Sequence, residues 1–550
     1  MNKQKRRIFN YRPMCCMALA LIGGIIIGEG MFGANFLFRL IPLFVLLAGF
    51  VVFVILKKTR RFAYLFVAAL VGLLAICGSG DVFAKNTKIG EYAGYMTARV
   101  SSEIRIEWDE DSDKDVYYFF VEDLYAGDTE LKYDGYVKLT SEDEPDYNAG
   151  DIIRIYGYLT ASTHTKFDSF HAYDVAKKEG YLIIASSVEK LSEGKLHLLE
   201  RIPYKIKSNF YSRLDEDTAA ICTALVIGDK EGLDEDLHDD ISASGLAHLL
   251  AVSGLHISVL SAALFFILRK CKLNAKICWI VVFLATLFYC FLCDFTASSL
   301  RALIMMTVIN LSSAFGRKRD TLSSISFAAV LILIFRPTAL FEAGFLMSFS
   351  AVIGITCYFL RFHHIGMKAV NKLSPKKHIG TRLSRAIALS LSANIATYPF
   401  VAYFFGEVPV LFVVSNVIVL PYLMFIYVFL LINTVLSLIV GWTGNMLMFK
   451  YLLFPFRAYV GAVGSLSFAT IPVTISIVGI VAFIIVFMLL SRFVFLKRTE
   501  KLVGALAVCT IALVTSAVVT LASAKPIADV EDEAEAFLIG ARGLFSRLRL

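Results

Sequence analysis

Long apolar blocks separated by short polar loops make up most of the chain. A membrane-spanning helix needs about 20 consecutive apolar residues, and about thirteen blocks are candidate spans of this kind. The pattern therefore predicts a polytopic α-helical membrane protein with about 13 transmembrane segments.

Residues 85–200 have a different pattern, in which apolar and polar side chains alternate in short runs. Alternation with a period of two is typical of half-buried strands. The runs are Tyr92–Val100, Val116–Val121, Gly135–Leu139 and Asp151–Leu159. Acidic or glycine-containing turns separate them, so we expect a small antiparallel all-β barrel of the OB type.

These patterns divide the chain into four expected parts. They are an N-terminal membrane anchor of three helices (1–80), an OB-like β domain (85–200), a larger transmembrane domain (201–524) and a short C-terminal tail (525–550). The basic cap Met1–Arg12 is followed by an apolar run, as in a signal peptide, but no small-residue cleavage site follows. We therefore expect an uncleaved anchor.

Charge is distributed unevenly and predicts the orientation. The chain carries a net charge of +8, yet Glu91–Glu200 holds 11 Lys and Arg against 24 Asp and Glu. The basic excess elsewhere lies mainly in short loops, above all in 361–385, which contains no acid. Cytoplasmic loops of membrane proteins are enriched in Lys and Arg. We therefore expect a multi-pass protein of the cytoplasmic membrane with a cytoplasmic N-terminus and an extracellular β domain.

The sequence offers no pattern for a metal, a cofactor or ATP. Its 10 cysteines are scattered without a disulfide or zinc spacing, and its 9 histidines form no His-x-His-x-Asp-His array. No Gly-x-x-x-x-Gly-Lys-Ser/Thr loop occurs either. We expect no cofactor, no metal site and no catalytic residues, so that the protein is not an enzyme.

The apolar stretch Gly245–Leu268 carries unusual polar residues in its first half. If it forms one membrane helix, His248 and His256 lie on one side and Ser253 lies one turn before His256. Gly254 leaves room for a neighbouring helix or a ligand. Polar groups at membrane depth are costly, so these four residues are candidates for a transport path, although contacts between helices explain them equally well.

Later segments add further candidates. Asp294 and Arg301 are seven residues apart, so on one helix they would share a face and could form an ion pair. Alternatively, the forked guanidinium of Arg301 suits a phosphate. Asn416, Pro399 and Pro421 lie inside apolar runs, where such residues mark kinked or broken helices that can line a pore.

Several blocks resemble, in order, those of the ComEC family, the inner-membrane DNA channel of natural competence. They are Ala-Leu-Val-Ile-Gly-Asp at 224–229, Gly-Leu-Ala-His-Leu-Leu-Ala-Val-Ser-Gly-Leu-His-Ile-Ser at 245–258, Asp-Phe-Thr-Ala-Ser-Ser-Leu-Arg-Ala at 294–302 and Gly-Phe-Leu-Met-Ser-Phe at 344–349. The last departs from the family's gly-phe-x-leu-ser-phe run, because Met347 replaces the usual leucine.

The resemblance implies a function and partners. It implies that 201–524 is a competence-type channel domain for single-stranded DNA, with His248, Ser253, Gly254, His256, Arg301 and Asn416 along the DNA path. It also implies a surface DNA receptor and a cytoplasmic helicase-like translocase as partners, besides membrane lipid. Many members continue into a metallo-β-lactamase-like domain, and this sequence contains no such domain.

Two other functions remain open at this point. The same scaffold could transport another solute or polymer, because the acidic β domain repels a polyanion on average. If the β domain does bind DNA, it needs a local basic patch, such as Lys132 with Lys138 or Lys166 with Lys177 and Lys178. Tyrosines among Tyr117, Tyr118, Tyr133 and Tyr136 could stack on the bases. A membrane-embedded hydrolase would use Ser253 with His248 or His256.

Overall fold

The computed structural model describes 13–29, 63–86 and most of 91–192 and 201–491, besides a few isolated positions. The gaps inside these ranges are 101–104, 110–113, 127–128, 131–133, 141–149, 162–178, 231, 251, 294, 315–319, 374–376, 441–445 and 474. The chain separates into two units, of which one comprises 11–397 and 408–471 and the other 1–10, 398–407 and 472–550.

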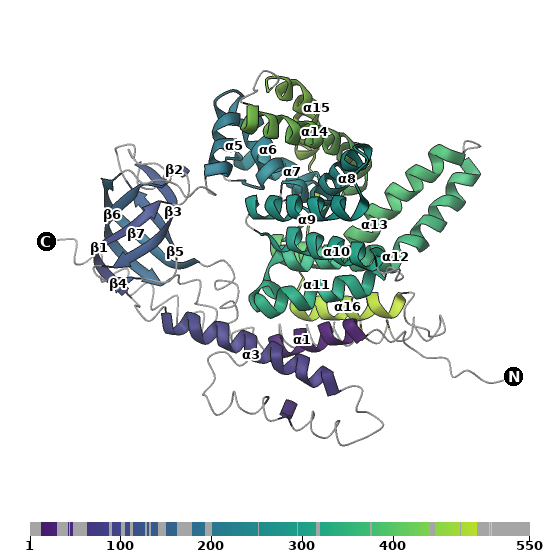
Figure 1. The fold of residues 1–550 in the computed structure, drawn as a ribbon, viewed down its shortest axis with the longest axis horizontal. Helices are drawn as coiled ribbons and strands as arrows, with labels where there is room; N and C mark the ends of the chain where they lie inside the picture. Colours follow the sequence, from purple (N-terminus) through teal and green to yellow (C-terminus); the bar gives the residue numbers. More distant parts are fainter. Residues whose placement is uncertain are drawn as a thin grey trace, which may run out of the picture. The chain divides into compact units, whose positions relative to one another are not determined.

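Seven strands of the first unit form one sheet (Figure 1). They are β1 (Glu91–Val100), β2 (Arg105–Asp109), β3 (Lys114–Ala126), β4 (Thr129–Glu130), β5 (Asp134–Thr140), β6 (Ile152–Ala161) and β7 (Glu179–Ser192). The four predicted strands are confirmed as β1, β3, β5 and β6, whereas β2, β4 and β7 were not predicted.

The sheet closes on itself as a barrel. β1 pairs with both β6 and β3, so that five strands form a ring in the order β1, β6, β7, β5, β3, while β2 and β4 pair with β3. β5 and β7 run parallel, so the prediction of a purely antiparallel sheet is wrong. Alternate residues point inward, and Met96, Phe119, Val137, Ile155 and Ile183 are almost fully buried there.

The helices of the first unit account for most of the remaining described residues (Figure 1). They are α1 (Pro13–Glu29), α3 (Ala63–Asn86), α5 (Arg201–Tyr211), α6 (Glu216–Ile227), α7 (Glu235–Ala243), η3 (Ala247–Leu249), α8 (Gly254–Lys270), α9 (Ala275–Leu292), α10 (Ala297–Ala314), α11 (Thr321–Phe335), η4 (Pro337–Phe341), α12 (Ala343–Leu373), α14 (Phe412–Val440) and α15 (Met448–Gly464).

A few elements complete the described chain. α13 (Lys377–Phe405) begins in the first unit and ends in the second, which also contains α16 (Ile477–Leu490). β8 (Glu407–Pro409) and β9 (Thr470–Pro472) form a two-stranded sheet. In the second unit, the backbone N–H of Val473 donates to the carbonyl of Gly406 over 2.8 Å.

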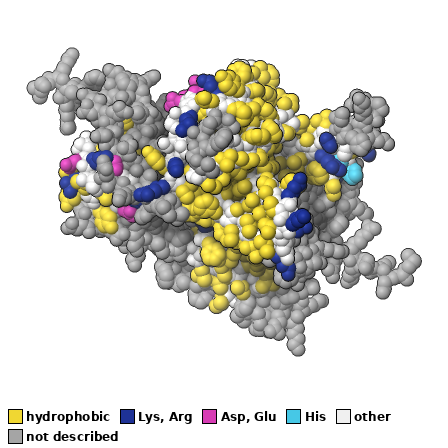
Figure 2. All heavy atoms as spheres, turned by 45° about the horizontal axis from the view of Figure 1, so that its top comes forward, with side chains coloured by type: hydrophobic (Ala, Val, Ile, Leu, Met, Phe, Trp, Pro, Cys, Tyr) yellow, Lys and Arg dark blue, Asp and Glu magenta, His cyan; other side chains and the backbone are white. Residues whose placement is uncertain are grey.

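Among the described residues, three helices are long and apolar enough to cross a membrane, namely Ala343–Lys368, Gly380–Phe405 and Phe412–Ile439. Six shorter apolar helical segments occur in the described chain, at Pro13–Gly28, Tyr64–Ile76, Lys276–Leu292, Ser298–Val308, Thr321–Phe335 and Ile477–Leu490. Figure 2 shows a broad hydrophobic surface interrupted by few charges, as expected where lipid is the solvent. The chain is a membrane protein, but this set does not confirm thirteen spans.

The helices of the first unit bury three separate apolar cores. One joins α1, α3, α11 and α12, and a second joins α5, α6, α7, α14 and α15. The third contains Val252, Ile257, Tyr289, Cys290 and Leu303 from α8, α9 and α10 and their approaches. This third core supports the candidate site.

Candidate functional site

The central stretch is not one helix, which corrects the prediction. It forms the short turn η3, an extended segment around Val252 and Ser253, and then α8 from Gly254. Gly245 adopts φ +77°, and a Cβ there would lie 2.9 Å from Phe412 Cβ, so this turn requires glycine. As a result, His248 and His256 lie on different elements, and α8 begins inside the bundle of helices.

Ser253 and His256 cap the N-terminus of α8. The hydroxyl of Ser253 accepts a hydrogen bond from the Leu255 N–H over 3.3 Å, and His256 Nδ1 accepts one from the Ser253 N–H over 3.0 Å. Such a capping box satisfies backbone donors that a helix start leaves open. The Ser253 Oγ to His256 Nδ1 distance is also 3.0 Å, as a hydrolase would need, but the capping role alone accounts for this contact.

The imidazole of His256 is fully buried and lies against Tyr427 of α14, with ring centroids 4.6 Å apart in an edge-to-face arrangement. Since Nδ1 accepts the Ser253 N–H, a neutral ring carries its proton on Nε2. No described residue accepts a hydrogen bond from this nitrogen. His256 therefore presents an unsatisfied buried donor next to the helix start.

A polar chain continues from the same tyrosine. The Tyr427 hydroxyl donates to the Tyr289 hydroxyl over 3.1 Å, which donates to the Val226 carbonyl over 2.8 Å. Both tyrosine side chains are buried. These two hydrogen bonds link α14, α9 and α6 next to α8 and stabilise the packing around the site. The sequence analysis missed both tyrosines, although a tyrosine inside an apolar run needs a hydroxyl partner, which was the available signal.

Arg301 of α10 is the strongest charge at the site. Its side chain is only 8% exposed, and its Nε has no hydrogen-bond partner among the described residues. The guanidinium carbon lies 5.9 Å from the ring centroid of Phe349, a contact of cation–π type. A Cβ built on Gly254 would lie 2.9 Å from Arg301 Nη2, so the guanidinium touches the first residue of α8.

This arrangement brings two positive features together in a buried place. A helix N-terminus carries about half a positive charge, and Arg301 adds a full charge with forked donors. No carboxylate of a described residue pairs with Arg301. The predicted partner Asp294 lies outside the described residues. Chemically, the site is suited to an oxyanion such as a phosphate diester.

Other predicted site residues lie elsewhere. Asn416 donates to Ser390 Oγ over 3.1 Å and so joins α14 to α13, eleven residues or about 16 Å along α14 from Tyr427. His248 lies on η3 and is exposed, yet it lies close enough to His256 for the two side chains to interact electrostatically. Pro399 and Pro421 lie inside α13 and α14, which continue through them, so neither helix is broken there, and the kinks stay a prediction.

The described barrel residues test only part of the DNA-contact prediction. Tyr117 is buried with 3% exposure, which confirms ordinary strand packing for it. Side chains of Tyr118, Tyr133 and Tyr136 lie outside the described residues, as do those of Lys132, Lys166, Lys177 and Lys178. Lys138 is half-buried. Among the described barrel residues, the exposed tyrosines are Tyr95, Tyr125, Tyr156 and Tyr158.

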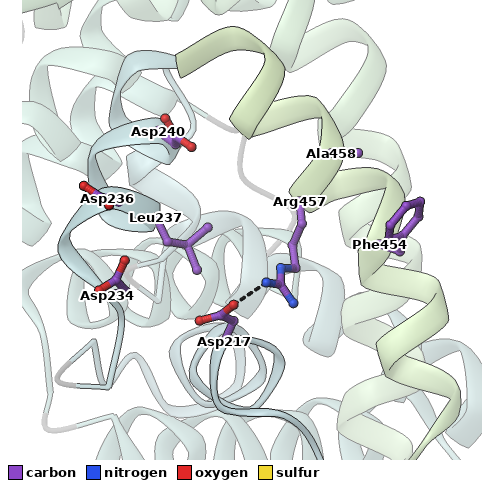
Figure 3. Close-up of a pocket in the computed structure, with 8 residues that line it drawn as sticks. All are labelled: Asp217, Asp234, Asp236, Leu237, Asp240, Phe454, Arg457 and Ala458. Carbon is purple, nitrogen blue, oxygen red and sulfur yellow. Dashed lines mark hydrogen bonds and ion pairs between the residues drawn. The ribbon is translucent and has the colours of Figure 1, made fainter. Parts of the chain in front are cut away.

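A separate open cavity of about 470 Å³ lies between α6, α7 and α15 (Figure 3). Arg457 of α15 binds Asp217 and, over 3.0 Å, Asp215. Asp240 faces the same cavity, and burial together with the charges of Asp236 and Asp239 raises its pKa above the ordinary value. The sequence analysis missed Arg457, although an arginine inside an apolar run was a usable signal. Among the described residues, no group is placed to hold a metal ion.

Comparison with known proteins identifies the family. The Competence protein family model matches residues 225–498, which include η3, α8, α10 and Arg301. The chain is 27% identical over 214 residues to ComE operon protein 3 of Bacillus subtilis (strain 168) and 28% identical over 224 residues to an uncharacterized protein of Aquifex aeolicus (strain VF5).

These two matches cover 39% and 40% of this chain, but only 26% and 47% of the respective relatives, so the chain matches less than half the length of either. No solved structure matches the chain significantly. The ordered blocks of the sequence, the apolar helices and the match over 225–498 agree, and residues 225–498 of the chain belong to the Competence protein family.

Proposed function

We propose that this chain is a channel that passes single-stranded DNA across the cytoplasmic membrane during natural transformation. Membership of the competence family supports a role in DNA uptake. The observation that carries the proposal further is Arg301, buried, without an ion-pair partner among the described residues and in contact with the N-terminus of α8.

A buried guanidinium without a counter-charge is costly, by about 3 to 5 kcal/mol when a pair is broken. The proposal explains this cost, because a phosphate of the strand supplies the missing negative charge each time it passes. One arginine and one helix end hold a single phosphate. The affinity of such a site is high enough for the strand to enter and low enough for it to leave. Positioning by Ser253 and His256 keeps the helix end in place.

The β domain belongs to the proposal as an extracellular barrel of the OB type. Its closed ring of five strands, with a single parallel pair between β5 and β7, supports this assignment. The basic loops support a multi-pass arrangement with a cytoplasmic N-terminus. A surface receptor would deliver the strand, and a helicase-like translocase would draw it inward, since the chain has no nucleotide-binding loop of its own.

The test is protection of labelled DNA from external nuclease in a competent host. Protected single strands are expected when the protein is re-expressed in a deletion strain and not in the deletion strain alone. Arg301→Gln should reduce protection about a hundredfold, because it removes the charge but keeps a polar side chain of similar length. Arg269→Gln is the matched control, because Arg269 lies exposed near the end of α8.

Membrane immunoblots establish equal abundance of the variants. Equal protection with Arg301→Gln and the wild-type chain would contradict the proposed role of Arg301. Equal protection with and without the chain would instead favour transport of another anion, since the site selects for an oxyanion and not for a base. Labelling of Ser253 by a serine-directed phosphonate, lost in Ser253→Ala, would favour a hydrolase.

A further inference from the structure

Two serine hydroxyls contact each other beside Arg301. Ser298 of α10 and Ser348 of α12 lie with their Oγ atoms 3.1 Å apart, and either hydroxyl can be the donor. Ser298 lies one turn before Arg301 on α10, and Ser348 directly precedes Phe349, whose ring contacts the Arg301 guanidinium. These two residues, the serine pair, therefore lie within one helical turn of the candidate site on both helices.

The serine pair has one hydrogen-bond donor more than its own contact uses. Each hydroxyl carries one proton, and the bond between them uses one of the two. Buried serines elsewhere in the helices, such as Ser261 of α8 and Ser392 of α13, donate to the carbonyl four residues before them. Neither member of the pair makes such a bond with a described residue. One hydroxyl proton is thus available to water or to a ligand.

Exposure along α10 shows how a ligand reaches the serine pair. Thr296, directly before the helix, is exposed, Ser298 is half-buried and Arg301 is 8% exposed. Ser348 is half-buried as well. Side chains of a helix lean toward its N-terminus, so the Arg301 side chain leans toward the turn that carries Ser298. A ligand that approaches Arg301 from this end of α10 therefore passes the serine pair.

The serine pair and Arg301 bind an anion in different ways. Arg301 brings a charge and an Nε without a partner among the described residues, whereas the hydroxyls are neutral donors. Residues three apart on a helix have Cβ atoms about 5 to 6 Å from each other. Successive charges of a nucleic-acid strand are about 3.4 Å apart along the axis when the bases stack, and farther apart in an extended strand. The spacing fits neighbouring phosphates of one strand.

We propose that the serine pair is a second phosphate subsite, which binds the linkage next to the one held by Arg301. This inference rests on the proposed function and narrows it. The site selects a phosphodiester polymer, because a single oxyanion can occupy only one of the two subsites. A neutral subsite adds a hydrogen bond to the strand but no second buried charge, so the strand still leaves as readily as transport requires.

The test compares two short strands bound to the full chain in nanodiscs of phosphatidylcholine. A thymidine dinucleotide without terminal phosphates contains a single phosphodiester, and the corresponding trinucleotide contains a pair of them. Each competes with a fluorescein-labelled oligothymidylate, and the competition gives both dissociation constants. The wild-type chain should bind the trinucleotide at least about tenfold more tightly than the dinucleotide, as a hydrogen bond to a charged group allows.

Ser298→Ala/Ser348→Ala should reduce this preference to at most about twofold, the statistical advantage of two equivalent linkages. Affinity for the dinucleotide should not change, and the slope of log affinity against log salt should also stay constant, because a hydroxyl releases no counterions. Arg301→Gln should instead lower that slope by about 0.7. The matched control is Ser261→Ala/Ser392→Ala, which removes two hydroxyls bonded within their own helices and should leave both affinities unchanged.

Three results would overturn the proposal. Equal binding of the two strands by the wild-type chain would mean that there is no second subsite. A loss of affinity for both strands in the double serine variant would mean that the serines only hold α10 and α12 in place. Undiminished binding of a trinucleotide whose linkages are one phosphodiester and one neutral methylphosphonate would mean that the additional base, and not the phosphate, provides the preference.

Failure of this inference is distinguishable from failure of the channel. If the wild-type chain protects DNA in cells but shows no preference for the trinucleotide, only the second subsite fails. If the wild-type chain gives no protected DNA, the channel proposal fails whatever the binding result.

Discussion

Among single residues of the candidate site, Gly254 has little room for a larger side chain. A Cβ at this position would lie 2.9 Å from Arg301 Nη2 and 3.5 Å from Ala302 Cβ, so Gly254→Ala pushes the guanidinium off the start of α8. We expect DNA uptake to fall about tenfold, which corresponds to about 1.4 kcal/mol. Nuclease protection in cells measures it. Gly344→Ala is the control, since a Cβ there meets nothing within 4 Å.

Helix propensity alone would favour both alanine variants. A normal uptake in Gly254→Ala would therefore show that the guanidinium does not need its position against α8. At this scale the sequence predicted Arg301, Gly254 and His256 as candidates from the cost of polar groups in a membrane. It did not predict how Ser253 and His256 interact, because that depends on where α8 begins, and the apolar residues before Ser253 read as a continuation of the helix.

At the scale of elements, ion pairs reinforce the apolar contact between α6 and α15. Arg457 binds the N-cap residue Asp215 and the first-turn residue Asp217 of α6, whereas Lys450 reaches Asp215 over 3.4 Å from a position that is 57% exposed. Arg457→Ala leaves two carboxylates without their main partner, so the free energy of unfolding should fall by about 1 to 3 kcal/mol. Lys450→Ala should cost less than about 1 kcal/mol.

Thermal unfolding of the purified protein in detergent, followed by tryptophan fluorescence, compares the two variants. An equal shift of Tm for both would mean that the exposed ion pair matters as much as the half-buried one, against expectation. Arg457→Lys is a useful third variant, because it keeps the charge but loses the two-pronged contact.

The sequence predicted strands better than it predicted their pairing. Alternation over the predicted runs of β1, β3, β5 and β6 is regular because one face of each run lines the barrel. β7 shows register shifts against β6, near Ile152 and Tyr156, and such irregularity breaks the period of two on which the prediction relied. The parallel pairing of β5 with β7 depends on the closed ring and has no local signal in either strand.

For the whole molecule, the orientation in the membrane is the testable feature. Tyr156 on the barrel and Lys368 on α12 are both exposed and should lie on opposite sides of the membrane. In a Cys271→Ser background, which removes an exposed native thiol, Tyr156→Cys should react with a membrane-impermeant maleimide in intact cells. Lys368→Cys should react only after permeabilisation. The reverse pattern would invert the proposed topology.

The packing of α1 has a consequence for the order in which the protein assembles. α1 contacts α11, where Ser326 Oγ donates to Cys15 Sγ over 3.1 Å across 311 residues of sequence. At about 5 to 20 residues per second, a ribosome needs about 15 to 60 s to reach that partner. Among the described elements, α1 meanwhile has only α3 to pack against, and Gly24 and Gly72 let the backbones of these two helices meet closely. α1 and α3 can thus pack together in the lipid first, with one face of α1 exposed until α11 is synthesised.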